Sequence, residues 1–201
     1  TDFESDTDFN LLAGFIRQNL NRRGGEFRGG VRIGDDPRLF AEFYQPTDPR
    51  QTWFVSVSGD VTRDAVRNFN ADTQAFGEFR FDSVRLDAAA GRVFSRVVEL
   101  RAGIAQEWGR LSNLVGFEAV PAIKYDDLSF VARLSADSFD NPFFPSRGFL
   151  GSVEYRESLD TEESLFNRSR LSGAMRFAAP FAGGVIVPAA EFGFALDPAT
   201  A

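Results

Sequence analysis

The chain has 201 residues, of which 43% are apolar and 25% charged, and a formal net charge of -7 at pH 7. It contains neither cysteine nor histidine. These absences exclude a disulfide framework, Cys or His metal sites, and catalysis by Ser-His-Asp or Cys-His groups. An acidic chain without a basic stripe also argues against nucleic acid as a partner. We therefore expect no enzyme activity, no cofactor and no metal site in this chain.

Phenylalanine occurs 23 times, against three tyrosines and two tryptophans, and aromatic residues favour strands. The chain opens on Thr1-Asp2-Phe3-Glu4, which is not a secretory signal. No apolar run approaches the roughly 18 residues that a membrane helix needs. A membrane β-barrel has no such run either, because only alternate residues touch lipid. The composition therefore leaves that class open.

Apolar and polar residues alternate along most of the chain, and this pattern predicts antiparallel strands. In residues 26–34, for example, Phe27, Val31 and Ile33 share one face, while Arg28 and Arg32 share the other. Residues 60–68 resemble a helix in part but continue a strand pattern. In chain order, after a linker at 1–7, we expect strands at 8–20, 26–34, 38–45, 52–67, 74–87, 92–106, 111–123, 128–136, 147–158, 166–178 and 184–195.

Residues that favour turns separate these strands. We expect longer polar connections at 46–51 and 158–164. Asp126-Asp127 is also expected in a turn. Short turns are expected at 21–25, 34–37, 88–91 and 182–184.

Three features favour a membrane barrel over a soluble β-sandwich. Charged side chains lie deep inside the strands, as in a hydrated lumen with cross-strand ion pairs. The strands are long, close to the nine to eleven residues of a tilted strand that crosses a bilayer. Aromatic residues near strand ends suit the membrane interfaces: Tyr44, Trp53, Phe54, Trp108, Phe143, Phe144 and Tyr155. The lumen-facing candidates are Arg28, Arg32, Arg133, Glu154, Arg156, Arg170 and Arg176.

Two segments resemble a known family. Residues 137–149, DSFDNPFFPSRGF, resemble the D-x-x-DNP-x-FP-x-RG element of the bacterial surface antigen barrels, the superfamily of BamA, TamA and the two-partner-secretion translocators. Residues 32–46, RIGDDPRLFAEFYQP, followed by Trp53-Phe54-Val55, are similar to the barrel of patatin-like phospholipase autotransporters. The resemblance implies a 16-stranded barrel, of which this chain has room for about two thirds. Neither a POTRA module nor the patatin Gly-x-Ser-x-Gly motif is found in the sequence.

The first segment carries the candidate structural motif. The side chains of Asp137, Asp140 and Asn141 are expected to cap a turn by hydrogen bonds in preference to binding calcium. The resemblance implies that the element sets barrel geometry and performs no chemistry. The whole motif comprises Asp137, Asp140, Asn141, Pro142, Pro145, Arg147 and Gly148.

The sequence thus predicts one all-β domain over residues 1–201, an antiparallel up-and-down transmembrane β-barrel or part of one, in the bacterial outer membrane. The expected function is a translocator or pore segment that anchors or exports an attached domain, with any phospholipase activity in an upstream domain. Expected partners are outer-membrane lipid and lipopolysaccharide, a translocated polypeptide, and a second copy paired through strand edges. The alternatives are a soluble β-sandwich binding module, a small passive outer-membrane channel, and a barrel enzyme, which the absence of histidine disfavours.

Overall fold

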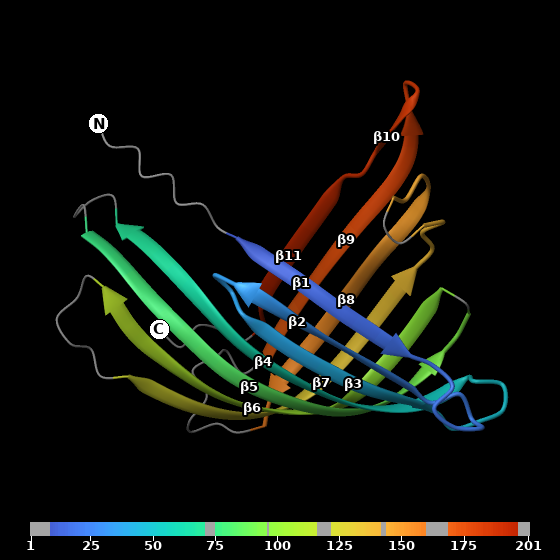
Figure 1. Ribbon diagram of the computed structural model, residues 1–201, viewed down its shortest axis with the longest axis horizontal. Coiled ribbons are helices and arrows are strands. Elements are labelled where there is room, and N and C mark those ends of the chain that lie inside the picture. Colours follow the sequence, from blue (N-terminus) through green and yellow to red (C-terminus); the bar gives the residue numbers. More distant parts are fainter. Residues whose placement is uncertain are drawn as a thin grey trace.

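The computed structural model describes residues 9–70, 75–95, 97–115, 122–141, 144–159 and 169–196. The linker expected at 1–7 and Pro142 of the motif lie outside the described residues. The described residues form one antiparallel sheet in which neighbouring strands follow one another along the chain. The sheet is strongly twisted and curls around a central space (Figure 1). The described part contains no helix that is long and apolar enough to cross a membrane.

Consecutive strands pair through backbone hydrogen bonds, and β4 to β7 are the longest, at 15 to 19 residues. Both β10 and β11 pair with β9 in one continuous register, with a break before Pro188. Because proline has no N–H to donate, the ladder is interrupted there. The strands are β1 (Asn10–Arg17), β2 (Glu26–Gly34), β3 (Arg38–Pro46), β4 (Trp53–Asn70), β5 (Ala75–Val93), β6 (Val98–Val115), β7 (Ile123–Asp137), β8 (Gly148–Ser158), β9 (Ser169–Phe181), β10 (Gly184–Ile186) and β11 (Ala189–Ala195).

The all-β, antiparallel, up-and-down architecture confirms the predicted fold class. The strand expected at 26–34 coincides with β2, and residues 60–68 lie in β4 as a strand. Several expectations are wrong. The turn expected at 88–91 lies inside β5, and the strand expected at 92–106 is interrupted, because β5 ends at Val93 and β6 begins at Val98. The strand expected at 111–123 is not a separate one among the described residues, because 111–115 belong to β6 and β7 begins at Ile123; residues 116–121 lie outside the described part.

The expected turn at 88–91 and the expected break at 107–110 each contain a glycine that lies opposite an aromatic residue. Gly91 of β5 pairs with Phe54 of β4, and Gly109 of β6 pairs with Tyr125 of β7. A Cβ atom at either glycine would overlap the ring of its partner. These glycines therefore mark the close approach of a ring from the next strand and not a turn. The same arrangement occurs at Gly30 with Phe40 and at Gly173 with Phe192.

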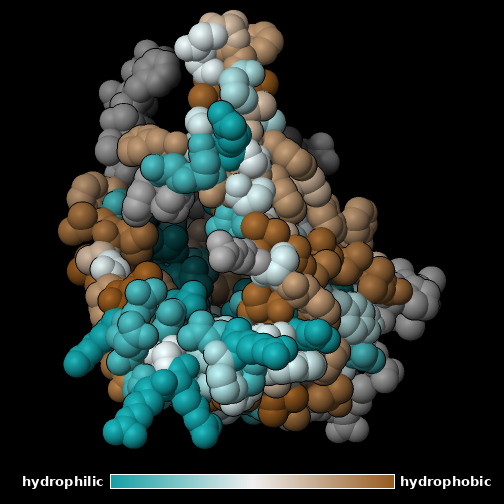
Figure 2. Space-filling view, turned by 90° about the vertical axis from the view of Figure 1, so that its right-hand side faces the viewer, coloured by the Kyte–Doolittle hydropathy of each residue, from teal (hydrophilic) through white to brown (hydrophobic). Residues whose placement is uncertain are grey.

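The two faces of the sheet differ in chemistry. The convex face exposes large apolar side chains, such as Val57 at 58% and Ile104 at 54% relative exposure. The buried apolar residues of the described part, Phe54, Ala105, Tyr125 and Ala178, belong to the opposite, concave face. Figure 2 shows hydrophobic residues along the outer sides and hydrophilic residues around the hollow between them. The fold thus places its apolar residues outward, where a water-soluble protein would place its polar ones.

We predict that Gly109→Ala lowers the free energy of unfolding by about 1–3 kcal/mol, because the added methyl group must displace the Tyr125 ring. The matched control is Gly193→Ala in β11, where the structure has nothing within 4 Å of the new Cβ. Urea unfolding in detergent micelles, followed by circular dichroism, measures both. Equal stabilities for the two variants would contradict the proposed role of Gly109.

Candidate functional site: the concave face and the β7–β8 turn

A first group of ion pairs on the concave face joins strands that are not neighbours. Arg101 of β6 contacts Glu99 of its own strand at 2.6 Å and Glu42 of β3 at 3.0 Å. Because β4 and β5 lie between β3 and β6 in the sheet, the contact with Glu42 crosses the hollow. Arg28 of β2 approaches the same carboxylate at 3.4 Å. Glu42 is therefore shared by two guanidinium groups and links three strands.

A second group surrounds Asp127 of β7, whose relative exposure is 1%. Arg156 of β8 contacts Asp127 at 2.8 Å and Glu107 of β6 at 3.0 Å. The Ser158 hydroxyl donates to Asp127 at 2.5 Å. Arg156 also donates from Nε to the Ser129 hydroxyl at 3.0 Å. A buried carboxylate is stable only with such a set of charged and hydrogen-bonding partners.

Further ion pairs extend this polar surface along the strands. Those with defined contacts are Arg85–Asp87 at 2.7 Å, Arg38–Asp60 at 2.7 Å, Arg32–Asp64 at 3.8 Å, and Arg133–Glu154 at 2.9 Å between Nε and Oε2. Two concave hollows lie among them, with volumes of about 290 Å³ and about 270 Å³. Arg85 lines both hollows. Walls of this kind hold water and suit a hydrated lumen.

The seven lumen-facing candidates all lie on the concave face. Five of them take part in ion pairs, namely Arg28, Arg32, Arg133, Glu154 and Arg156. Arg170 and Arg176 form no ion pair with a described residue. Sequence reasoning missed Arg85, Asp87, Glu107 and Asp127. It placed Asp127 in a turn and Glu107 in a break between strands, and the continuous alternation of β6 and β7 was the signal that could have found them.

The concave face also holds two aromatic residues that the sequence placed at a membrane interface. Tyr44 and Phe54 pack with ring centroids 4.6 Å apart, and the guanidinium of Arg101 lies 5.4 Å above the Phe54 ring. The interfacial expectation is therefore wrong for both. Trp53, in contrast, is exposed on the convex face near a strand end, with Arg92 5.2 Å from its ring.

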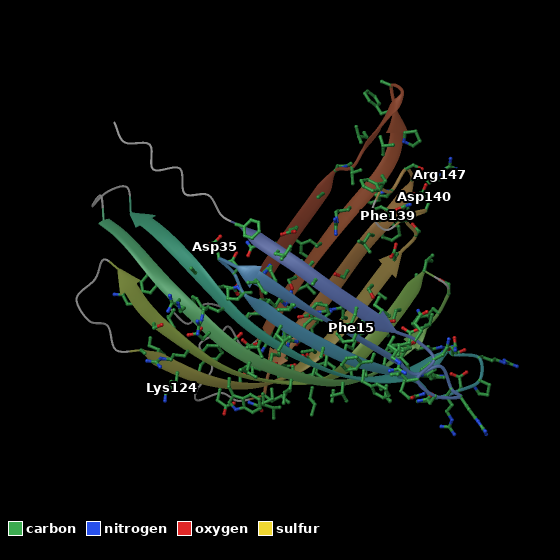
Figure 3. All side chains as sticks on the ribbon, viewed as in Figure 1. Phe15, Asp35, Lys124, Phe139, Asp140 and Arg147 are labelled. Atoms are coloured by element: carbon green, nitrogen blue, oxygen red, sulfur yellow. The ribbon has the colours of Figure 1, made fainter. Side chains whose placement is uncertain are left out.

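The β7–β8 turn contains the structural motif at one end of the sheet (Figure 3). Asp137, Asp140 and Asn141 each accept backbone N–H groups through a side-chain oxygen. The donors are Phe139 to Asp137 at 3.0 Å, Ser146 and Arg147 to Asp140 at 2.8 and 3.2 Å, and Phe144 to Asn141 at 2.9 Å. These side-chain hydrogen bonds, together with the one from the Asp140 backbone N–H to the Arg147 carbonyl, hold the described part of the turn between β7 and β8.

Gly148 closes this turn with a φ of 106°, a conformation that glycine adopts readily. A Cβ at this position would overlap the carbonyl oxygen of Ser138. The Ser138 N–H donates to the Phe149 carbonyl at 2.8 Å, which begins the β7–β8 ladder. Arg147 is exposed, and its side chain forms no ion pair with a described residue; Pro145 is half-buried before it.

The carboxyl group of Asp140 has a pKa lowered from 3.8 to about 2. The largest cause is the hydrogen bond from the Ser146 hydroxyl, followed by those from the Ser146 and Arg147 backbone N–H groups. All of them favour the charged carboxylate.

Neither a protein-family model nor a curated protein sequence matches this chain. Its structure is similar to the crystal structure of BamA from Haemophilus ducreyi lacking POTRA domains 1-3, with a TM-score of 0.61 and 12% sequence identity. The match covers 93% of this chain and 38% of that chain, so this chain spans well under half the length of that structure. At this identity the likeness shows the fold, an antiparallel sheet of the kind that forms the BamA barrel.

We predict that the Asp140 carboxyl titrates near pH 2. Because its pKa is lower in the folded turn than in an unfolded chain, the carboxylate stabilises the turn above about pH 4, and this contribution is lost as the pH falls toward 2. Carboxyl ¹³C NMR measures the titration. Ser146→Ala should raise the pKa toward 3.8, and a midpoint near 3.8 in the parent chain would contradict the turn geometry.

We also predict that Arg156→Met lowers the free energy of unfolding by about 3–5 kcal/mol, because Asp127 would stay buried without its cation. Arg170→Met is the control, since it removes the same charge from an exposed side chain of the same face and should cost within about 0.5 kcal/mol. Thermal unfolding in detergent micelles compares the two variants. A similar loss for both would show that the Asp127 pair contributes little.

Proposed function

We propose that this chain forms part of the wall of a bacterial outer-membrane β-barrel, with its convex face toward lipid and its concave face toward a hydrated lumen. The segregation of the two faces is the observation that carries this proposal. Exposed apolar side chains cover the convex face, and ion pairs cover the concave one. A soluble β-sandwich needs a second layer over its apolar face, whereas the described residues form a single sheet.

The height of the apolar surface supports the same proposal. On the convex face of β4, Arg63 lies ten positions after Trp53, and every convex residue between them is valine or glycine. At about 3.3 Å per residue and a tilt of about 45°, ten residues rise about 23 Å. This is close to the roughly 25 Å of an outer-membrane apolar band. Trp53 and Arg92 at one border are of the kind found at membrane interfaces.

Within such a wall, we propose a translocator or anchor for an attached domain, as the resemblance of residues 137–149 and 32–46 to surface antigen barrels implies. Residues 32–46 resemble the patatin-like phospholipase type, and any lipid hydrolysis would belong to the attached domain. The concave ion pairs would bind water and stabilise the curvature of the wall. They would also offer polar contacts to a passing polypeptide. The edges β1 and β11 would pair with further strands or with a second copy.

A pair of single-cysteine variants tests the orientation of the two faces. The chain has no cysteine, so each variant carries one thiol for an environment-sensitive NBD fluorophore. Val57 and Ser58 are neighbours at mid-span, on the convex and concave faces respectively. In the full chain refolded into phospholipid vesicles, we expect blue-shifted NBD emission, quenched by lipid-borne spin labels, for Val57→Cys only.

The fluorophore at Ser58→Cys should emit as in water and resist the lipid quencher. Equal quenching at both positions would contradict the assignment of faces. A chain that folds as a monomer in plain buffer, with the label at Val57→Cys shielded from water, would instead favour the soluble alternative.

A further inference from the structure

A row of charged residues crosses the convex face at the border of the apolar surface. Arg63, Asp82, Arg110 and Lys124 lie directly opposite one another on β4, β5, β6 and β7. Arg63 pairs with Asp82 at 2.5 Å. Arg110 and Lys124 face each other, and neither forms an ion pair with a described residue. Because like charges in direct opposition destabilise a sheet, an anion bound between Arg110 and Lys124 would relieve their repulsion.

A shallow apolar groove of about 650 Å³ adjoins this row. Trp108 forms part of its wall and lies two residues before Arg110 on the same face of β6. Arg63, Arg110 and Lys124 also line the groove. Its apolar lining continues across four further strand positions, Val31, Leu39, Val61 and Val84, which stand opposite one another in register with Trp108.

Other charges on this face leave the surroundings positive. Asp126 lies opposite Trp108; its carboxylate accepts a hydrogen bond from the neutral Gln106 amide and keeps its negative charge. Arg80, two residues before Asp82 on the same face of β5, adds a cation. Figure 3 shows Lys124 near the start of β7, on the outer side of the curled sheet. Among the side chains that the structure describes here, four cations (Arg63, Arg80, Arg110 and Lys124) therefore stand against two carboxylates (Asp82 and Asp126), and Asp82 is already paired with Arg63.

We propose that this row and groove bind a phosphorylated lipid, with its phosphate between Arg110 and Lys124 and an acyl chain along the groove against Trp108. The inference rests on the convex face meeting lipid, as proposed above. Arginine and lysine bind phosphate through charge-assisted hydrogen bonds. A soluble anion would satisfy these cations but leave the apolar groove empty, and for this reason the chemistry favours a lipid.

Trp108 is the reporter for the test. The chain has two tryptophans, so Trp53→Phe leaves Trp108 alone. The full chain, refolded in dodecyl maltoside micelles, is titrated with phosphatidic acid or phosphatidylcholine carrying brominated acyl chains, which quench tryptophan on contact. We expect half-maximal quenching at a mole fraction about tenfold lower for phosphatidic acid, because its phosphate has no choline to offset the charge. Inorganic phosphate should compete weakly.

The matched variants separate the site from overall charge. The double variant Arg110→Gln with Lys124→Gln should reduce the preference for phosphatidic acid over phosphatidylcholine to within about twofold. Arg110→Gln alone should reduce this preference in part. Arg170→Gln with Arg176→Gln, which removes two cations from the concave face, should leave it intact. Equal quenching by the two lipids in the parent, a preference that survives the convex double variant, or full displacement by inorganic phosphate would overturn the site. Absence of quenching by either lipid would overturn the lipid-facing assignment as well.

Discussion

The backbone ladder between neighbouring strands is the interaction on which this structure depends, because side-chain packing contributes little. A chain of this length ordinarily buries a large apolar core, yet only four apolar residues of the described part are buried. Most hydrophobic stabilisation must therefore come from whatever medium covers the convex face. In lipid, an unpaired N–H or C=O has no water to bind, so each hydrogen bond of the ladder matters more than it would in a soluble sheet.

The register of that ladder also decides which side chains meet. Along each strand, every second residue points to the concave face, and these residues include Glu42, Arg101 and Asp127 with their partners. The residues between them point to the convex face and form its apolar surface and its charged row. A shift of one residue would exchange the two faces. Phe54 over Gly91 illustrates how a large ring fits the polar side. The glycine makes room for the ring, and the Arg101 guanidinium covers it.

Sequence reasoning recovered the period-two pattern, and with it the fold class, the two faces and the positions of β2, β3 and β8. It failed where one residue type, glycine, is compatible with either a turn or a strand position opposite a large ring. Gly91 was placed in a turn and Gly109 in a gap between two expected strands, and only the opposing strand shows that these glycines accommodate Phe54 and Tyr125. The ion pair of Glu42 with Arg101 crosses two intervening strands, so no sequence separation could reveal it before the curvature was known. The turn at 137–148 was easier, because its hydrogen bonds are local.

The direction of the edge strands has a consequence for assembly. Because β10 and β11 form one line along β9, the described strands make ten antiparallel passes. Ten is even, so the outer edges, β1 and β11, run in opposite directions. They can thus meet in antiparallel fashion, either with each other or with the opposite edge of a second copy. Any set of up-and-down strands inserted between them must also be even in number, a parity rule that constrains every closed barrel this wall can join.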